Sequence, residues 1–166
     1  MLRVISSSPG DLEPVFQAIL ENATRICEAS FGNLLLYDGD KFRRVALYNP
    51  PHEWNELTRL HPVVHPGPKD PLVRLIETRQ FLHINDIRTE QAYIDREPSI
   101  VAIAEMAGAR TLIVVPMVKE NTLVGAIAVY RQQIRPFSDK QIALLKNFAA
   151  QAVHRHREHA AAQRAA

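Results

Sequence analysis

The histidines of this sequence include one pair with a spacing suited to metal binding. His61 and His65 are four positions apart, which would place two ligands on the same face of a helix. Pro62 and Pro66 follow them directly, and a proline inside a helix removes a backbone hydrogen bond and clashes with the preceding turn. We therefore predict no metal at this pair.

The single cysteine, Cys27, lies among apolar residues at helical spacing. A cysteine nucleophile needs a lowered pKa and a neighbouring base, whereas an unpaired cysteine on an apolar face is usually a buried structural side chain. One cysteine also excludes an internal disulfide bond and a zinc site built from cysteines, and it suits a reducing compartment. We expect a buried thiol without a catalytic role.

Other common enzyme signatures are missing from the sequence. The six glycines include no Gly-x-Gly spacing, which argues against a dinucleotide-binding turn and a phosphate-binding loop, and there is no Gly-x-Ser-x-Gly elbow. The acidic residues between positions 86 and 105 have no spacing that would hold two carboxylates together for acid–base work. We predict no catalytic residues.

A ligand pocket is a separate expectation. His83 lies on a predicted strand that is otherwise apolar, where it either lines a pocket or satisfies its hydrogen bonds within the core. Apolar and aromatic side chains elsewhere could form a wall over the sheet, and the alternative is ordinary packing beneath long loops. The predicted ligand-binding residues are Trp54, His83, Tyr93, Ile94, Ile100 and Ala104.

Size and charge narrow the class of protein that these residues belong to. The chain has 166 residues, 46% of them hydrophobic, which suffices for one domain with a sizeable core. Its net charge of +2 lacks the basic excess of a nucleic-acid-binding protein. No apolar run is long enough to span a membrane, and the first eight residues are too short and polar for a signal peptide. We expect a cytoplasmic protein that neither binds nucleic acid nor inserts into a membrane.

The elements that must position the site begin and end with helices. Apolar residues recur every three to four positions from Leu12 to Cys27, and we expect Asp11 to cap this helix and Gly32 to stop it. Near the other end, Ser138 and Gln141 form a capping box that starts a second amphipathic helix. Asp70 is expected to cap a short helix with Pro71 in its first turn, and another short helix is predicted over residues 99–107.

Strands are predicted between these helices, over residues 33–37, 41–48, 81–85, 111–118 and 123–130. Asp38-Gly39 suits the tight turn of the first hairpin. The proline-rich stretch 49–71 is expected to be a long surface loop with at most a short helical turn. The predicted fold is α+β, with a central antiparallel sheet of five to six strands, the terminal helices on one face, and loops and short helices on the other. Residues 1–10 are expected to be a lead-in, 11–155 the domain, and 156–166 a helical extension or linker.

Two stretches near the C-terminal end resemble a known family. Residues 108–117 (GARTLIVVPM) and 123–127 (LVGAI) resemble the paired strands of GAF domains, and residues 131–142 (RQQIRPFSDKQI) with 147–149 (NFA) resemble the terminal helix entry of GAF domains in bacterial sensor histidine kinases and cyclases. The resemblance extends over roughly residues 11–155. It implies a profilin-like sheet, a small pocket, and a regulatory role for an attached kinase or cyclase. Cyclic-nucleotide-binding and bilin-binding members carry signature residues that are not found here, so no cofactor is predicted and the ligand is an unknown small molecule.

The terminal helices suggest how such a module assembles. Their apolar stripes suit both packing on the sheet and a two-fold helical bundle. We expect a homodimer through Val15, Ala18, Leu144 and Phe148, with an effector domain in the same full-length chain. One alternative is a structural dimerisation spacer whose pocket is filled by Leu72, Ile100 and Ile103. Another is an enzyme of the methionine sulfoxide reductase branch of the same fold, which depends on reactive cysteines.

Overall fold

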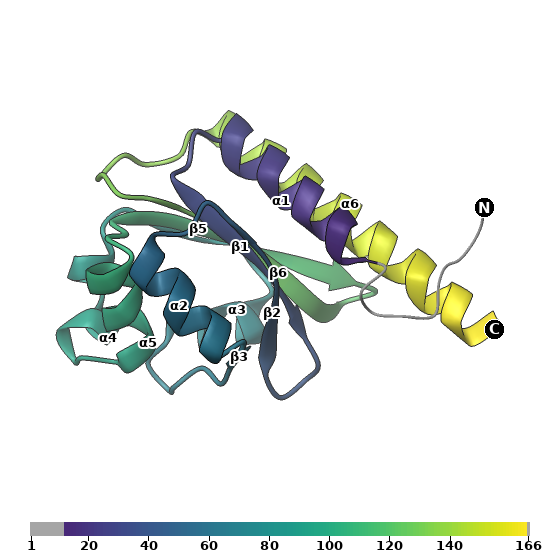
Figure 1. Ribbon diagram of the computed structural model, residues 1–166, viewed down its shortest axis with the longest axis horizontal. Helices are drawn as coiled ribbons and strands as arrows, with labels where there is room; N and C mark the ends of the chain where they lie inside the picture. Colours follow the sequence, from purple (N-terminus) through teal and green to yellow (C-terminus); the bar gives the residue numbers. More distant parts are fainter. Residues whose placement is uncertain (1–11, 166) are drawn as a thin grey trace.

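An antiparallel sheet forms the middle layer of the protein. The computed structural model describes residues 12–165 (Figure 1). The strand order is β3-β2-β1-β6-β5-β4, and all pairings are antiparallel. The predicted antiparallel sheet is confirmed. The strands are β1 (Phe31–Tyr37), β2 (Phe42–Tyr48), β3 (Val63–Val64), β4 (Leu82–Ile84), β5 (Thr111–Lys119) and β6 (Thr122–Arg131).

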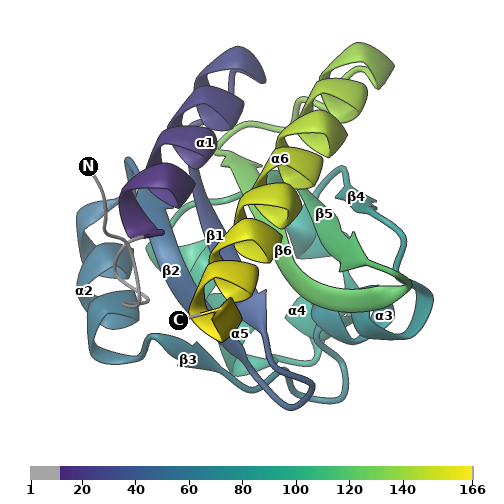
Figure 2. The same ribbon diagram turned by 90° about the vertical axis from the view of Figure 1, so that its right-hand side faces the viewer.

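Helical layers cover both faces of this sheet. Helices α1 (Glu13–Ile26) and α6 (Asp139–Ala165) lie side by side on one face, and α6 continues beyond the sheet (Figures 1 and 2). The predicted α+β arrangement, with the terminal helices together, is confirmed. The other face carries α2 (His52–Leu60), α3 (Pro71–Thr78), the 3-10 turn η2 (Ile87–Thr89), α4 (Gln91–Ile94), α5 (Pro98–Val101) and the π-helical turn η3 (Ala102–Met106).

The ends of the terminal helices follow the sequence signals only in part. Ser138 and Gln141 form the predicted capping box, with reciprocal hydrogen bonds of 2.9 and 3.1 Å to each other's backbone N–H. Asp11, the expected cap of α1, lies outside the described residues. Gly32 is not the stop of α1, because it lies inside β1. Glu28 takes the left-handed conformation after the helix instead, with φ 56°.

The predicted long loop over residues 49–71 is wrong, because much of it folds into α2 and β3. Trp54 and Thr58 are buried on the inner side of α2, and Leu57 packs against the same core. The prolines of this stretch lie outside the helix, and Pro51 directly precedes it. Their number hid a helix whose apolar spacing covers only nine residues.

The sheet separates two hydrophobic cores. The core beneath α1 and α6 includes Phe16, Ile127 and Leu145, whereas the core on the opposite face includes Phe31, Trp54 and Tyr130. Strands β1, β5 and β6 contribute to both, which explains why their sequences are nearly continuous apolar runs. Among residues 12–165, none of the helices has the length and apolar character required to cross a bilayer.

Candidate functional site

A cavity of about 390 Å³ lies between the sheet and the helical layer that contains α2, α3 and α5. Its size falls within the range of pockets that enclose small organic ligands. The exposed residues His61, Val63 and His65 lie among its lining residues, so the cavity opens to solvent beside β3. The apolar part of the lining includes Leu35, Trp54, Leu57, Val64, Leu72, Ile100, Ala102, Ile103, Leu112, Val114 and Ala128.

An aromatic cluster forms one part of the cavity wall. The ring of Tyr130 stacks on that of Phe31 with 4.7 Å between centroids, and Trp54 meets both rings at 5.3 and 5.9 Å. The guanidinium of Arg44 lies 5.5 Å from the centroid of the Trp54 ring. These contacts fix the rings on β1, β6 and α2, so the cavity has a rigid wall.

Two polar side chains of this cavity are incompletely paired. The Asn33 amide donates to the Tyr130 hydroxyl at 3.3 Å, and its Oδ1 has no hydrogen-bond partner within the described chain. Arg44 donates from Nη1 to the His61 carbonyl at 3.3 Å, whereas its buried Nε is without a partner among residues 12–165. Because leaving such groups unpaired costs free energy, both are suited to bind a ligand. Burial lowers the pKa of Arg44 and raises that of Tyr130 to about 12.

A buried carboxylate also lines the cavity. Asp70 is only 4% exposed and caps α3 by accepting a hydrogen bond from the Leu72 N–H at 2.8 Å. Its second oxygen accepts from the Ser99 hydroxyl at 2.6 Å. Burial raises the pKa of Asp70, opposed by these hydrogen bonds. No cation of the described chain forms a salt bridge with this carboxylate.

Comparison with known proteins identifies the family. The family model described as GAF domain matches residues 10–154. The chain belongs to the GAF domain family. No curated protein matches the sequence.

Solved structures share the fold of this GAF domain. A GAF domain/HD domain protein from Geobacter sulfurreducens is similar with a TM-score of 0.73 and 19% identity, covering 86% of this chain and 90% of that one. A domain described as part of a two-component sensor histidine kinase of Sinorhizobium meliloti gives 0.72 and 18%, covering 97% and 100%. A type II free methionine-R-sulfoxide reductase from Thermoplasma acidophilum gives 0.66 and 14%, covering 90% and 95%. At these identities the likeness concerns the fold.

Two of the six predicted ligand-binding residues, Trp54 and Ile100, line the cavity of the GAF domain. Ala104 is buried in the same core without lining the cavity. Tyr93 donates a hydrogen bond to Glu105 at 2.8 Å outside the cavity, and Ile94 is 59% exposed. These last two side chains belong to α4, and neither of them lines the cavity.

His83 lies on the opposite face of the sheet from the cavity. Its ring is 5.8 Å from that of Phe137, and its Nε2 accepts a hydrogen bond from the Phe137 N–H at 3.1 Å. Burial lowers the pKa of His83, and the nearby Arg131 lowers it further. The alternation of side chains along β4 explains this placement, because Leu82 and Ile84 face the cavity-side core.

Cys27 and the histidine pair show no catalytic arrangement. Cys27 is buried at the end of α1, and burial raises the pKa of its thiol, opposed by the charge of Arg131. Such a thiol holds its proton at neutral pH, which is the opposite of nucleophile activation. His61 and His65 lie at the cavity opening. Within the described part of the chain, no three His, Cys, Asp or Glu side chains are grouped closely enough to hold a metal ion.

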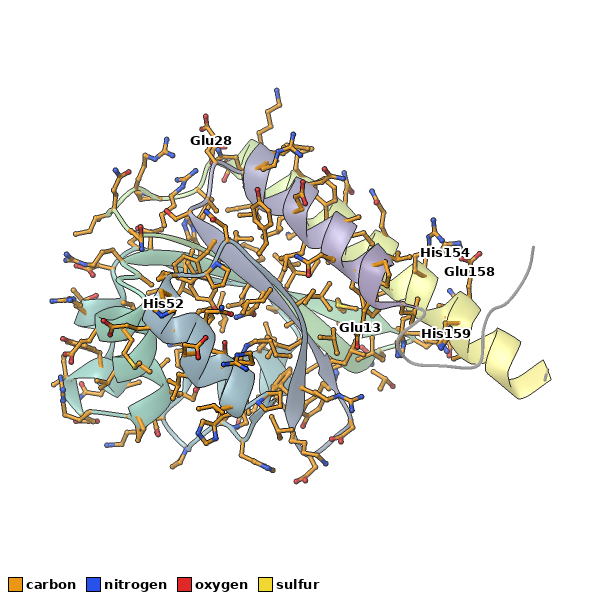
Figure 3. The ribbon with its side chains drawn as sticks, viewed as in Figure 1. Glu13, Glu28, His52, His154, Glu158 and His159 are labelled. Carbon is orange, nitrogen blue, oxygen red and sulfur yellow. The ribbon has the colours of Figure 1, made fainter. Side chains whose placement is uncertain are left out.

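The proposed dimer residues lie on the helix pair. Val15 and Ala18 line a groove of about 630 Å³ between α1 and α6, and Ala150 and His154 line its other side. Leu144 and Phe148, one turn apart on α6, are half-buried. Figure 3 shows His154 and Glu158 projecting from α6 on the side away from the sheet, and their side chains are 3.3 Å apart.

The polar residues of the cavity were not predicted from the sequence, although some of them are unusual for the strands in which they lie. Asn33 and Tyr130 are polar side chains within strands that are otherwise apolar on both faces. Arg43 and Arg44 are adjacent on a strand, so one of them must point inward. The capping role of Asp70 was expected, but its second contact with Ser99 depends on α5 and cannot be read from spacing.

Proposed function

We propose that this GAF domain is a non-catalytic regulatory signalling module that binds a small molecule in the cavity and controls an effector domain in the same full-length chain. The observation that carries the proposal is the cavity itself, in which buried polar atoms of Asn33 and Arg44 lack partners. A spacer with a filled pocket would not be built this way. Leu72, Ile100 and Ile103, the expected fillers, line the cavity and leave about 390 Å³ open.

The sheet offers a physical route from the cavity to the terminal helices. Strands β1 and β6 contribute Leu35 and Ala128 to the cavity-side core, and Leu34 and Ile127 to the core beneath α1 and α6. A ligand that shifts these strands slightly therefore changes the surface on which both helices pack. Two discrete packings of α1 and α6 would form the switch.

Thermal unfolding with a library of small organic metabolites tests ligand binding. A ligand that binds only the folded protein raises the melting temperature as its concentration increases. We expect Ala102→Leu, which fills part of the cavity, to abolish this increase, while Ala143→Leu adds the same side chain on exposed α6 and preserves it. An unchanged melting temperature of the native protein across the library would overturn the ligand-binding function, as would an increase that persists in Ala102→Leu.

We also propose that the module forms a homodimer through the outer faces of α1 and α6, around Val15, Ala18, Leu144 and Phe148. The support is the groove between the two helices, bordered by the small side chains Ala18 and Ala150 that allow close approach. Light scattering at high micromolar concentration should give twice the monomer mass. Ala18→Glu should give the monomer mass. Leu60→Glu changes an exposed side chain of α2 and should keep the dimer mass. A native protein that scatters as a monomer would refute the dimer.

A further inference from the structure

The cavity wall carries one arginine, Arg44, and two carboxylates, the buried Asp70 and the half-buried Glu97, and Arg44 is not paired with Asp70. Arg44 from β2 and Asp70 from the start of α3 both line it. Within residues 12–165, neither takes part in a salt bridge shorter than 4 Å. Both influence the same group: the charge of Arg44 lowers the pKa of Tyr130, and that of Asp70 raises it. Tyr130 lines the same cavity as both charged side chains.

Each of the two charged groups keeps hydrogen-bonding capacity. Arg44 uses Nη1 for the His61 carbonyl and has no partner for its buried Nε. The two Asp70 oxygens accept only from neutral donors, the Leu72 N–H and the Ser99 hydroxyl, and each carboxylate oxygen can accept a second hydrogen bond. A buried charge is costly unless it is paired with an opposite charge. Arg44 and Asp70 are therefore two charges that a ligand with complementary groups can pair with.

The remaining wall defines the rest of the ligand. It is formed mainly by aliphatic side chains and the Trp54 ring, and the Asn33 amide, the Tyr130 hydroxyl and Glu97 are further polar groups of the lining. Such a wall favours an apolar substituent of the size of a hydrocarbon side chain or a phenyl ring.

We propose that the cavity binds a small organic zwitterion, with its carboxylate on Arg44, its ammonium group on Asp70, and its apolar substituent against the aliphatic wall. This inference rests on the proposed function that the cavity is a ligand site, and it specifies the chemical class. A guanidinium binds a carboxylate through two parallel N–H donors. A buried carboxylate binds an ammonium group strongly, because a hydrogen bond between two charged groups is stronger than one between neutral groups. Arg44 and Asp70 are then the residues that determine specificity.

Two sets of three probes test the assignment by calorimetry and thermal unfolding. The first set is phenylalanine, 3-phenylpropanoate and 2-phenylethylamine, and the second is leucine, 4-methylpentanoate and 3-methylbutylamine. Within a set the apolar part is constant and only the charged groups differ. We expect the amino acid of at least one set to bind about tenfold or more tightly than both of its singly charged relatives, which corresponds to about 1.4 kcal/mol.

Matched variants separate the two charges. Arg44→Gln should weaken binding of the amino acid and the acid while leaving the amine unchanged. Asp70→Asn keeps an oxygen that can cap α3, and it should weaken binding of the amino acid and the amine while leaving the acid unchanged. Equal affinity for the acid and the amino acid, or an Asp70→Asn variant with unaltered amino-acid affinity, would overturn the proposal.

Failure of this inference is distinguishable from failure of the proposed function. If neither amino acid binds, but neutral or singly charged metabolites raise the melting temperature in a manner abolished by Ala102→Leu, the zwitterion is wrong and the ligand site stands. If neither the probes nor the library change the melting temperature, both proposals are wrong.

Discussion

Arg131 and Arg44 extend from the same sheet into the protein, and their surroundings differ. Arg131, at the end of β6, is 2% exposed, and its guanidinium lies 4.0 Å from the centroid of the Phe137 ring. Arg44 has one carbonyl partner and a buried nitrogen without any, within the described residues. The comparison teaches that several fixed acceptors hold Arg131 in place, whereas Arg44 keeps a donor free, as its proposed role in ligand binding requires. The acceptors of Arg131 are the carbonyls of Cys27, Glu28, Arg135 and Pro136 and the side chain of Gln141.

Removal of the Arg131 side chain is one of the two changes that should have the largest effect. Arg131→Met leaves several inward carbonyls without a donor, and we expect a loss of about 3 kcal/mol in the free energy of unfolding, since each unsatisfied group costs about 1–3 kcal/mol. Arg135→Met is the control, because its side chain is about half exposed and its ion pair with Glu28 is 3.7 Å long. We expect a loss of less than about 1 kcal/mol for it. Equal losses in urea titrations would contradict a special role for Arg131.

Truncation of one leucine on each face of the sheet compares how tightly the two faces are packed. Leu145 is fully buried beneath α6, and Leu145→Ala should cost about 2–5 kcal/mol because it creates a cavity in a packed core. Leu72 borders the existing cavity and is half-buried, so Leu72→Ala should cost about 1 kcal/mol. Urea unfolding of both variants measures the difference. Comparable losses would mean that the cavity face is packed as tightly as the helix face.

Acidification should lower the free energy of unfolding through His83, which lies near Arg131. The pKa of His83 is lowered in the folded protein, so the unfolded chain takes up the proton first as the pH falls. The contribution of His83 is therefore complete above its ordinary pKa of about 6.5 and is lost as the pH falls through the folded value. His156, whose pKa burial also lowers, acts with the same sign. The difference in stability between pH 7 and pH 5 should decrease in His83→Gln and remain in His52→Gln, and an unchanged difference in His83→Gln would contradict the assignment.

The smallest effect on stability is expected for Arg44. Arg44→Met replaces an incompletely paired guanidinium by an apolar side chain of similar length, and exchanges of this kind are often neutral or stabilising. We expect the free energy of unfolding of the free protein to change by less than about 1 kcal/mol. A loss as large as that of Arg131→Met would place Arg44 among the structural arginines and would remove the distinction.

Long, strongly patterned elements could be predicted from the sequence. The apolar periodicity of α1, the capping box of α6 and the apolar runs of β5 and β6 all depend on neighbours in the chain, and they placed the sheet and its helices correctly. Helix α2 was missed because its packing depends on Trp54, whose burial is a tertiary effect. The π-helical turn η3 was likewise seen only as helical spacing.

The cavity was less predictable because it depends on strand register. The ladder between β1 and β2 pairs Leu34 with Ala46 and Leu35 with Arg44, so Val45 is an extra residue in β2. This bulge changes which side chains face the cavity, and no local signal marks it. The face of the sheet on which His83 lies could not be predicted either, because the residues on both sides of it in the sequence are apolar.

The two outermost strands are also the shortest. β3 contains two residues and β4 three, and they lie at opposite edges of the sheet. Each of these two strands therefore offers only a short row of unpaired backbone groups, and an additional strand from another molecule finds little to pair with on β3 or β4. Addition of a further strand at β3 or β4 is disfavoured for this reason.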